Sequence, residues 1–427
     1  MEETGRPMGA RSIRRAGAIR PRTGLRSEVG PGALLAVIRE SGGLTRRDLI
    51  DMTGFARATV ESRLDALLGS GLIVERARQG GSGGRPPKVF SFNEQAGYLL
   101  SVVLGSSHTR IGVSDLGCRT VALEDLDVDM SAGPGVVLGA VGTRLRRMLE
   151  QRGIEPRTVL GVGVGVPSPV ELGGRMARPP ERGGLSDLGG QWADVVIARE
   201  IMAFLPGLGV EAVPVVVDKD ANIMALGEWR TTWPDVRDLI VFKVGITLAC
   251  GIVANACVVR GVGGIAGDLG HVPDPASDVR CRCGQSGCAE AVASGEAIRR
   301  ALGERGRGLK RGRDIVELLH AGDPEVAEHV VRAGRHIGRV IGDAISTLNP
   351  ELVVVGGTLA EDNPLLIDSI RSVAASRVHP LAAASTQIVA STIKEDTGVI
   401  GAALLALEEA LDPVVVDAMV GAGRSAG

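Results

Sequence analysis

Residues Gly263–Glu290 read GGIAGDLGHVPDPASDVRCRCGQSGCAE and hold three of the six cysteines of the chain within eight positions. These are Cys281, Cys283 and Cys288, and His271 stands ten residues before the first of them. Thiolates and a neutral imidazole are the donors of a closed tetrahedral zinc site, and interleaved glycines let a short loop wrap around an ion. The C-x-C-x4-C spacing therefore predicts bound zinc.

Two alternatives to a zinc site are weaker. Free cysteines are often plain buried apolar residues, but this loop is too polar and too rich in glycine to form a core. Disulfides would leave one of the three clustered cysteines unpaired, and nothing in the sequence suggests export to an oxidising compartment.

The charge of the chain is unevenly distributed. Its net charge is −2, but residues 1–92 contain sixteen Arg and Lys against nine Asp and Glu, a balance of +7, which leaves −9 for the rest. A basic front end on an acidic body predicts a polyanionic partner for the front end alone. No apolar run reaches the length of a membrane span, and the Arg-rich N-terminus lacks the apolar core of a secretory signal. We therefore expect a cytoplasmic protein with no membrane partner.

The pattern after the first thirty residues predicts three helices and two strands. Thr45, followed three residues later by Asp48, predicts the N-cap of a helix over Arg46–Met52. A further helix is expected over Ala56–Gly69, with apolar residues at core spacing. Two short helices joined by a glycine-bearing turn, followed by two apolar strands, are typical of a winged helix-turn-helix.

The loop between the two strands, ERARQGGSGGRPPK, is basic and contains Gly84-Arg85-Pro86. Glycine allows close approach, proline stiffens the turn, and Arg85 can enter a narrow minor groove of strongly negative potential. A solvated basic loop is the plain alternative, but the preceding helices favour DNA. The residues expected to contact DNA are Arg57, Ala58, Thr59, Ser62, Arg85 and Pro86.

The rest of the chain predicts two related α/β lobes. A β-meander over residues 99–127, with a helix and a strand after it, is followed by a second meander over 238–260 with helices and a strand of its own. Such a repeat implies a ligand cleft where the lobes face each other. The expected domains are a disordered Arg-rich arm (1–30), the winged helix-turn-helix (31–93), lobe 1 (94–212, with 398–411 packing back on it), lobe 2 with the zinc loop (213–397) and a loose tail (412–427).

The turns of the two meanders argue against ATP binding. Two-lobed folds of this kind hold nucleotide phosphates on Gly-rich turns, and a carboxylate holds magnesium. The turn Val103–His108 has no carboxylate, and the turn Lys243–Gly251 carries bulky residues where a phosphate cradle needs glycine.

A sugar-sized cleft is better supported. The segment Asp218-Lys219-Asp220-Ala221-Asn222 follows an apolar strand and opens a helix. Asp220 can there accept hydrogen bonds from hydroxyl groups or act as a base toward them, although helix capping by either aspartate fits equally well. Asp268, His271 and Glu290 flank the zinc loop and could converge on the same polyol.

These residues together resemble the ROK family of repressors, open reading frames and sugar kinases, over nearly the whole chain. The specific segments are GGRPPKVFSFN, similar to the wing of the repressor branch, GVGVGVPSPV and VDKDAN, similar to the sugar-site segments, and GGIAGDLGH with CRCGQSGCAE, similar to the zinc signature. The resemblance implies a two-lobed actin-like, ribonuclease-H-like α/β fold of the sugar-kinase ATPase type. It also implies zinc ligands His271, Cys281, Cys283 and Cys288, sugar contacts from Asp220, Asp268, His271 and Glu290, and Asp220 at the position of the kinases' catalytic base.

The departures from the kinase pattern concern both turns. Val103 replaces an aspartate, Ser107 a threonine, and Ile246-Thr247-Leu248-Ala249 the Gly-rich loop. Because phosphoryl transfer depends on positioning ATP and neutralising its charge, these losses imply that no kinase activity and no catalytic residue remain.

The sugar-site segments depart too. Lys219 stands where an asparagine is usual, Ser168 where a glycine is usual, and Asp268 where the family has glutamate. The ammonium of Lys219 would favour an anionic ligand, or would pair with Asp220 or Asp268 and close the site.

The sequence thus predicts a DNA-binding transcriptional regulator, a repressor of carbohydrate-related genes. The expected partners are double-stranded operator DNA, a sugar or sugar-phosphate effector bound between the lobes through Lys219, Asp220, Asp268, His271 and Glu290, and a second copy in a homodimer or homotetramer. The alternative is an ATP-dependent sugar kinase with an accessory DNA-binding domain, and a third hypothesis is a DNA-binding protein whose effector site has decayed.

Overall fold

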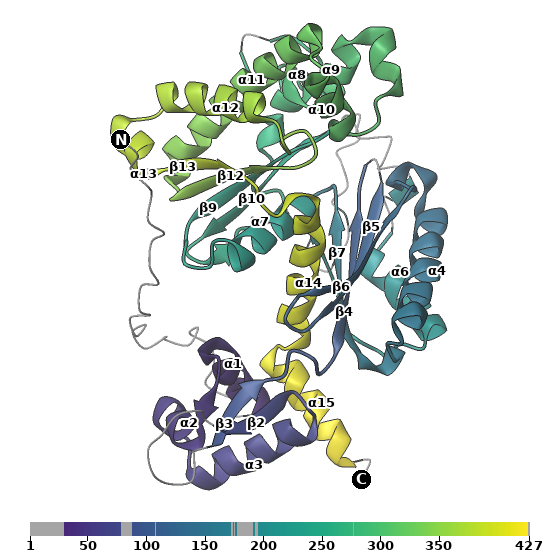
Figure 1. The fold of residues 1–427 in the computed structure, drawn as a ribbon, viewed down its shortest axis with the longest axis vertical. Coiled ribbons are helices and arrows are strands. Elements are labelled where there is room, and N and C mark those ends of the chain that lie inside the picture. The colour runs from purple at the N-terminus through teal and green to yellow at the C-terminus, as the bar shows by residue number, and fades with distance from the viewer. Residues whose placement is uncertain are drawn as a thin grey trace, which may run out of the picture.

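The computed structural model describes residues 30–77, 88–106, 108–171, 174, 176, 191–192, 195–275 and 277–425. Three parts follow one another along its longest axis: a small N-terminal head at one end, an α/β lobe in the middle and a second α/β lobe at the other end (Figure 1). Among the described residues no helix is both long and apolar enough to cross a membrane.

The head consists of α1 (Pro31–Ser41), α2 (Arg46–Thr53), α3 (Arg57–Gly69) and a small sheet in the order β1 (Leu44–Thr45), β3 (Lys88–Phe92), β2 (Ile73–Ala77). The predicted N-cap of α2 is confirmed, because Thr45 Oγ1 accepts a hydrogen bond from Asp48 N at 3.2 Å and Thr45 N donates to Asp48 Oδ2 at 2.9 Å. Gly54, with φ 69°, ends α2 in the left-handed conformation. This is a winged helix-turn-helix, as predicted.

The two lobes have sheets of the same strand order. The first sheet runs β6 (Thr120–Leu126), β5 (Thr109–Asp115), β4 (Tyr98–Leu104), β7 (Val159–Val166), β8 (Val215–Lys219), and the second runs β11 (Cys257–Val258), β10 (Leu248–Ala254), β9 (Leu239–Val244), β12 (Leu352–Gly356), β13 (Gln387–Ala390). In each sheet an antiparallel meander is extended by two parallel strands. The repeated topology confirms the predicted actin-like, two-lobed fold.

Helices cover both sheets. The first lobe has α4 (Pro134–Arg152) and α6 (Ile197–Phe204), and the second has α7 (Asp220–Thr231), α8 (Ala289–Ala293), α9 (Gly295–Ala301), α10 (Gly312–His320), α11 (Pro324–Leu348), α12 (Pro364–Arg377) and α13 (Pro380–Ser385). The chain then forms α14 (Thr397–Ala410) and α15 (Pro413–Ser425), and α15 packs on the head. Each lobe has its own apolar core. A third cluster of buried residues joins the head to α7, α14 and α15.

Helix α14 lies between the lobes and touches both at backbone distance (Figure 1). A Cβ atom on Gly163 of β7 would lie 1.8 Å from the carbonyl oxygen of Ala402, and one on Gly401 would lie 1.8 Å from that of Ile223 in α7. Ser101 Oγ of β4 also donates to the carbonyl oxygen of Val399 at 3.0 Å. The alternating glycines of β7, which resemble a sugar-site segment, therefore also make room for α14.

Two of the expected boundaries are wrong. The loose tail expected at 412–427 is wrong for residues 413–425, because they form α15, which packs on α1 and buries Val416 and Val420. Asp417 Oδ1 accepts a hydrogen bond from Gly32 N at 2.7 Å, at the start of α1. The division at 212/213 also fails, because β8 pairs in parallel with β7 and so belongs to the first sheet.

Candidate functional site

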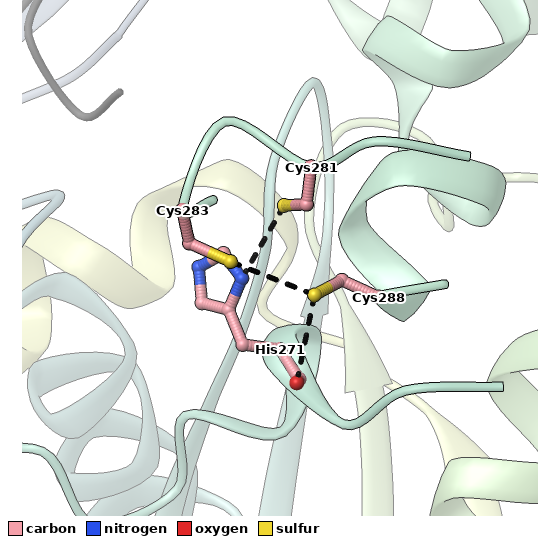
Figure 2. Close-up of side chains that lie close together, drawn as sticks. All are labelled: His271, Cys281, Cys283 and Cys288. Carbon is pink, nitrogen blue, oxygen red and sulfur yellow. Dashed lines mark hydrogen bonds between the residues drawn. The ribbon is translucent and has the colours of Figure 1, made fainter. Parts of the chain in front are cut away.

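The structure gathers His271, Cys281, Cys283 and Cys288, and their donor atoms all lie within 4.8 Å of one another. Cys283 Sγ is 3.6 Å from Cys288 Sγ, and His271 Nδ1 is 3.5 Å from Cys281 Sγ (Figure 2). A tetrahedral ion with metal–sulfur bonds of about 2.3 Å places neighbouring sulfurs about 3.8 Å apart. The four donors therefore fit a metal ion of zinc's size and preferences.

The loop that carries the cysteines is shaped by backbone hydrogen bonds. Cys281 N donates to the carbonyl oxygen of Gln285 at 2.8 Å, and Gly284 N donates to that of Cys281 at 3.0 Å. Gly284 and Gly287 have φ of 91° and 76°, a region that glycine enters without strain. The tight loop turns Cys281, Cys283 and Cys288 toward one point.

A second cluster lies where β8 meets α7. Asp220, the first residue of α7, is buried, and its Oδ1 accepts from Ala221 N at 2.7 Å. Its Oδ2 accepts from the ammonium of Lys243 on β9. The carboxylate of Asp220 is therefore held in an ion pair between the start of α7 and β9 of the second sheet.

Asp218 and Lys219, beside it, are also buried. Asp218 Oδ1 accepts from Asn222 Nδ2 at 2.7 Å and from Lys219 N at 2.7 Å, and Asp218 Oδ2 pairs with Arg260 Nε at 2.7 Å. Lys219 Nζ donates to the carbonyl oxygen of Ala266 at 2.6 Å. Pairing of Lys219 with Asp220 or Asp268 was one of the two alternatives that the sequence left open, and among the described residues its ammonium instead donates to this carbonyl.

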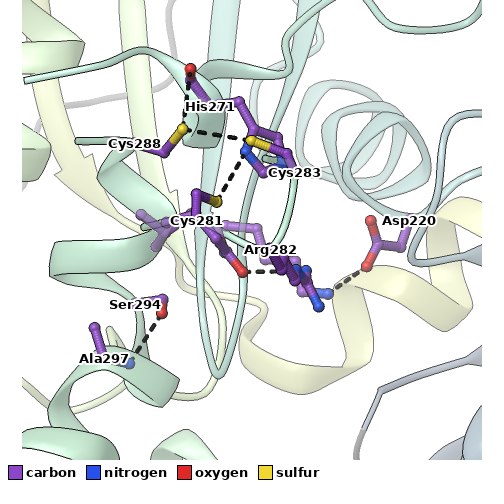
Figure 3. Close-up of polar contacts among 11 residues, drawn as sticks. Asp220, His271, Cys281, Arg282, Cys283, Cys288, Ser294 and Ala297 are labelled. Carbon is purple, nitrogen blue, oxygen red and sulfur yellow. Dashed lines mark hydrogen bonds and ion pairs between the residues drawn. The ribbon is translucent and has the colours of Figure 1, made fainter. Parts of the chain in front are cut away.

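Glu290 follows the loop that carries Cys281, Cys283 and Cys288, here called the metal loop, and connects it to the second sheet. It is buried, its Oε2 accepts from Leu248 N at 2.5 Å, and its Oε1 accepts from Arg282 Nη2 at 3.1 Å. Burial raises the pKa of Glu290 by more than the nearby cations Arg282 and Lys243 lower it. Figure 3 shows Arg282 and Asp220 together with the cluster of His271 and the three cysteines.

A cavity of about 110 Å³ lies between the lobes. Its walls are the two meander turns, residues 103–106 with 108 and residues 243 and 245–247, and it also includes Asp220, Met224, Thr358 and Gly398 at the start of α14. Asp220 and Lys243 both face it. At this size the cavity holds a group such as a phosphate or a carboxylate and falls short of the roughly 300 Å³ or more typical of drug-sized ligands.

Two of the predicted sugar contacts, Asp268 and His271, lie beside the cysteine cluster. Asp268 precedes the short 3-10 turn Leu269–His271, and His271 N donates to the carbonyl oxygen of Asp268 at 3.2 Å. Asp268 acts electrostatically on Glu290. The carboxylates of Asp268 and Glu290 therefore lie within electrostatic reach of each other, beside the metal loop.

The predicted DNA contacts that the structure describes lie in the first turns of α3. Arg57, Ala58 and Ser62 are exposed and Thr59 is half-buried. Arg57 Nε pairs with Glu61 Oε1 at 3.1 Å. The remaining two, Arg85 and Pro86, lie outside the described residues.

Sequence reasoning missed three cations: Lys243, Arg260 and Arg282. A lysine inside the apolar strand LIVFKV was a usable signal for Lys243, since a buried ammonium needs a carboxylate. Arg282 was another, because it stands between Cys281 and Cys283 and so must lie beside the cysteine cluster. Arg260 gave no signal, since its partner lies 42 residues away.

The sequence model that describes the ROK family matches residues 100–409 of this chain. The xylose repressor of Bacillus spizizenii is 25% identical over 388 residues, which cover 91% of this chain and 97% of the repressor. The glucokinase of Halalkalibacterium halodurans is 26% identical over 329 residues, 73% of this chain and 96% of the kinase.

A solved structure with the same fold is that of a ROK family transcriptional regulator, a homolog of the E. coli MLC protein. It has 24% sequence identity and a TM-score of 0.73, and the match covers 91% of this chain and 98% of that one. Since the family model matches residues 100–409, which is more than half of the chain, the chain belongs to the ROK family.

Proposed function

We propose that this protein is a DNA-binding transcriptional repressor whose affinity for its operator is set by a sugar or sugar derivative bound between the lobes. The observation that carries the proposal is the winged helix-turn-helix head, joined to sugar-kinase-type lobes in a chain that aligns with 97% of a xylose repressor. A kinase that only phosphorylates sugars has no use for such a head.

On the DNA side, α3 would enter the major groove with Arg57, Ala58, Thr59 and Ser62, and Arg85 with Pro86 would reach the adjacent minor groove. The exposed side chains at the start of α3 support this arrangement. A homodimer or homotetramer would present two such helices to a palindromic site.

We further propose that the protein is not a sugar kinase. A general base must be free to accept the proton of the attacking hydroxyl, and Asp220 is already paired with Lys243. Val103 and the Ile246–Ala249 segment give the two turns neither a carboxylate for magnesium nor a glycine cradle for phosphates.

Zinc is the metal we propose for the cluster of three cysteines and one histidine, since these soft donors in a closed set suit it best. It would act structurally, by fixing the loop that carries Arg282 and Glu290. Those two residues, together with Asp220, Asp268, His271 and Lys219, would then line the effector site.

The proposal is tested by selecting sequences bound by the full-length protein from a random duplex library and measuring their affinity by fluorescence anisotropy at several salt concentrations. We expect one enriched, palindromic sequence, and an Arg57→Ala variant weakened about tenfold or more. Arg152→Ala, at the exposed end of α4, is the matched control and should bind as the parent does. Failure to enrich any sequence would refute the DNA-binding role. Turnover of ATP on hexoses or pentoses in a coupled assay would instead support the kinase alternative.

A further inference from the structure

The start of α3, the helix proposed to enter the major groove, lacks the side chains that usually stabilise a helix N-terminus. Its N-cap residue, Ala56, makes no side-chain hydrogen bond, and no acidic residue stands in its first turn. Arg57 occupies the first helical position instead, where a cation opposes the helix dipole. The start of α2, in contrast, carries the capping box of Thr45 and Asp48. The first turn of α3 is therefore not built for the stability of the helix, and its positive end suits an anionic partner.

Arg57 is held from one side by Glu61, which lies one turn further along the helix. Arg57 Nε donates to Glu61 Oε1 at 3.1 Å, and Arg46 Nε of α2 lies 3.9 Å from the same oxygen. The guanidinium of Arg46 lies over the ring of Phe90 on β3, 5.8 Å from its centroid. The carboxylate of Glu61 thus lies between two arginines, one on its own helix and one on α2.

The order of Arg57 and Glu61 along the helix is not the one that stabilises a helix. An ion pair four residues apart is more favourable with the acid first, because that order matches the helix dipole. Exposed pairs contribute little to stability in either order, and the side chain of Arg57 is 77% exposed. The contact is therefore better explained by its effect on Arg57 than by any gain for α3.

Arg57 keeps most of its donors for a partner. A guanidinium has five N–H groups, and among the described residues Arg57 uses only the one on Nε. The two terminal nitrogens remain, with donors that point the same way in one plane. Such a pair matches the O6 and N7 acceptors of guanine in the major groove, the commonest specific contact between protein and DNA. Because the contact with Glu61 also restrains the guanidinium, less side-chain freedom is lost on binding.

We propose that Arg57 recognises a guanine in each half of the operator through its two terminal nitrogens, and that Glu61 is a positioning residue that presents this end of Arg57 to the base. This inference rests on the proposed function and specifies a base that α3 recognises. Glu61 does not touch the DNA in this scheme. Its charge would repel the phosphates, and the nearby guanidinium groups of Arg46 and Arg57 offset that charge.

The test measures discrimination between bases as well as affinity. The full-length protein is titrated by fluorescence anisotropy against its selected operator and every single-base-pair variant of it, at several salt concentrations. We expect the parent to prefer G·C at one base pair of each half-site about tenfold or more, equivalent to about 1.4 kcal/mol. Arg57→Lys keeps the charge but loses the paired donors, so this preference should disappear while the salt dependence stays unchanged.

Glu61→Ala should weaken the preference at that same base pair about fivefold, because Arg57 then loses its preorganisation for the two-donor contact. Its affinity for unrelated duplex should rise, since one negative charge is gone. Asp65→Ala is the matched control, because Asp65 is exposed on the same helix one turn later. This variant should also bind unrelated duplex more tightly, with the preference for G·C unchanged. A purely structural role of Glu61 would instead change the affinity for every sequence equally.

Four outcomes overturn the inference. They are an Arg57→Lys variant that keeps the parent's preference, a base pair other than G·C as the one that depends on Arg57, a Glu61→Ala variant that keeps the preference in full, and a Glu61→Ala variant that loses discrimination at a different base pair. The last would make Glu61 a base contact itself. If the parent selects no sequence at all, the proposed function fails instead. Because two residues are varied separately, the test remains valid if one variant misfolds.

Discussion

Replacing Gly163 by alanine tests how closely α14 lies on the first sheet. The added Cβ would be 1.8 Å from the carbonyl oxygen of Ala402 and 2.7 Å from its carbonyl carbon. Because a carbon and an oxygen in contact lie about 3.3 Å apart, α14 would have to move by about 1.5 Å. Overpacking usually costs about 1–3 kcal/mol. Both partners here are backbone and cannot rotate away, so we expect about 3 kcal/mol of lost stability.

The measurement is urea unfolding followed by circular dichroism, with Gly139→Ala as the matched control. Gly139 lies in α4, and a Cβ atom there meets nothing within 4 Å. The same chemical change should therefore stabilise the protein by about 0.5–1 kcal/mol, since alanine favours a helix over glycine. Opposite shifts are the expected result. If Gly163→Ala unfolds at the same urea concentration as the parent, α14 does not lie in backbone contact with β7.

Three further predictions concern separate parts of the molecule. Cys283→Ser should remove the metal proposed for the cysteine cluster and lower the melting temperature. If mass spectrometry finds as much metal in this variant as in the parent, Cys283 is not a metal ligand. Burial raises the pKa of Glu228, so its contribution to stability is present below the unfolded pKa of about 4.3 and is lost as pH rises through the raised value. Glu228→Gln should therefore raise the melting temperature more at pH 8 than at pH 4, and an equal gain at both would contradict the raised pKa. Asp417→Ala removes the hydrogen bond to Gly32 N and should lower the stability of the head by about 1 kcal/mol. The loss should be seen as roughly fivefold faster amide hydrogen exchange in α1. Unchanged exchange would mean that α15 does not stabilise the head.

Features that depend on residues close together in the sequence could be predicted. The N-cap of α2 needs only Thr45 and Asp48, three positions apart, and the cysteine cluster needs only the spacing of three thiols and a histidine. The presence of two related lobes followed from the repeated meander, because a second copy of a pattern implies a second copy of a lobe.

Contacts between distant residues could not be predicted in the same way. Lys243 meets Asp220 because β9 of the second sheet passes the first turn of α7. No pattern of neighbouring residues in the sequence predicts this contact. For the tail the signal was present but unused. Pro413 follows Asp412, and Val416 and Val420 are spaced as one face of a helix.

The contact between α1 and α15 has a consequence for how the protein is made. Gly32 and Asp417 are 385 positions apart, so the ribosome releases the first helix of the head long before it makes the helix that covers it. Until then, Leu34, Leu35 and Ile38 lack part of their apolar cover. The head therefore acquires its final packing only after both lobes have been made, and a nascent chain stalled in lobe 2 carries an incompletely covered head.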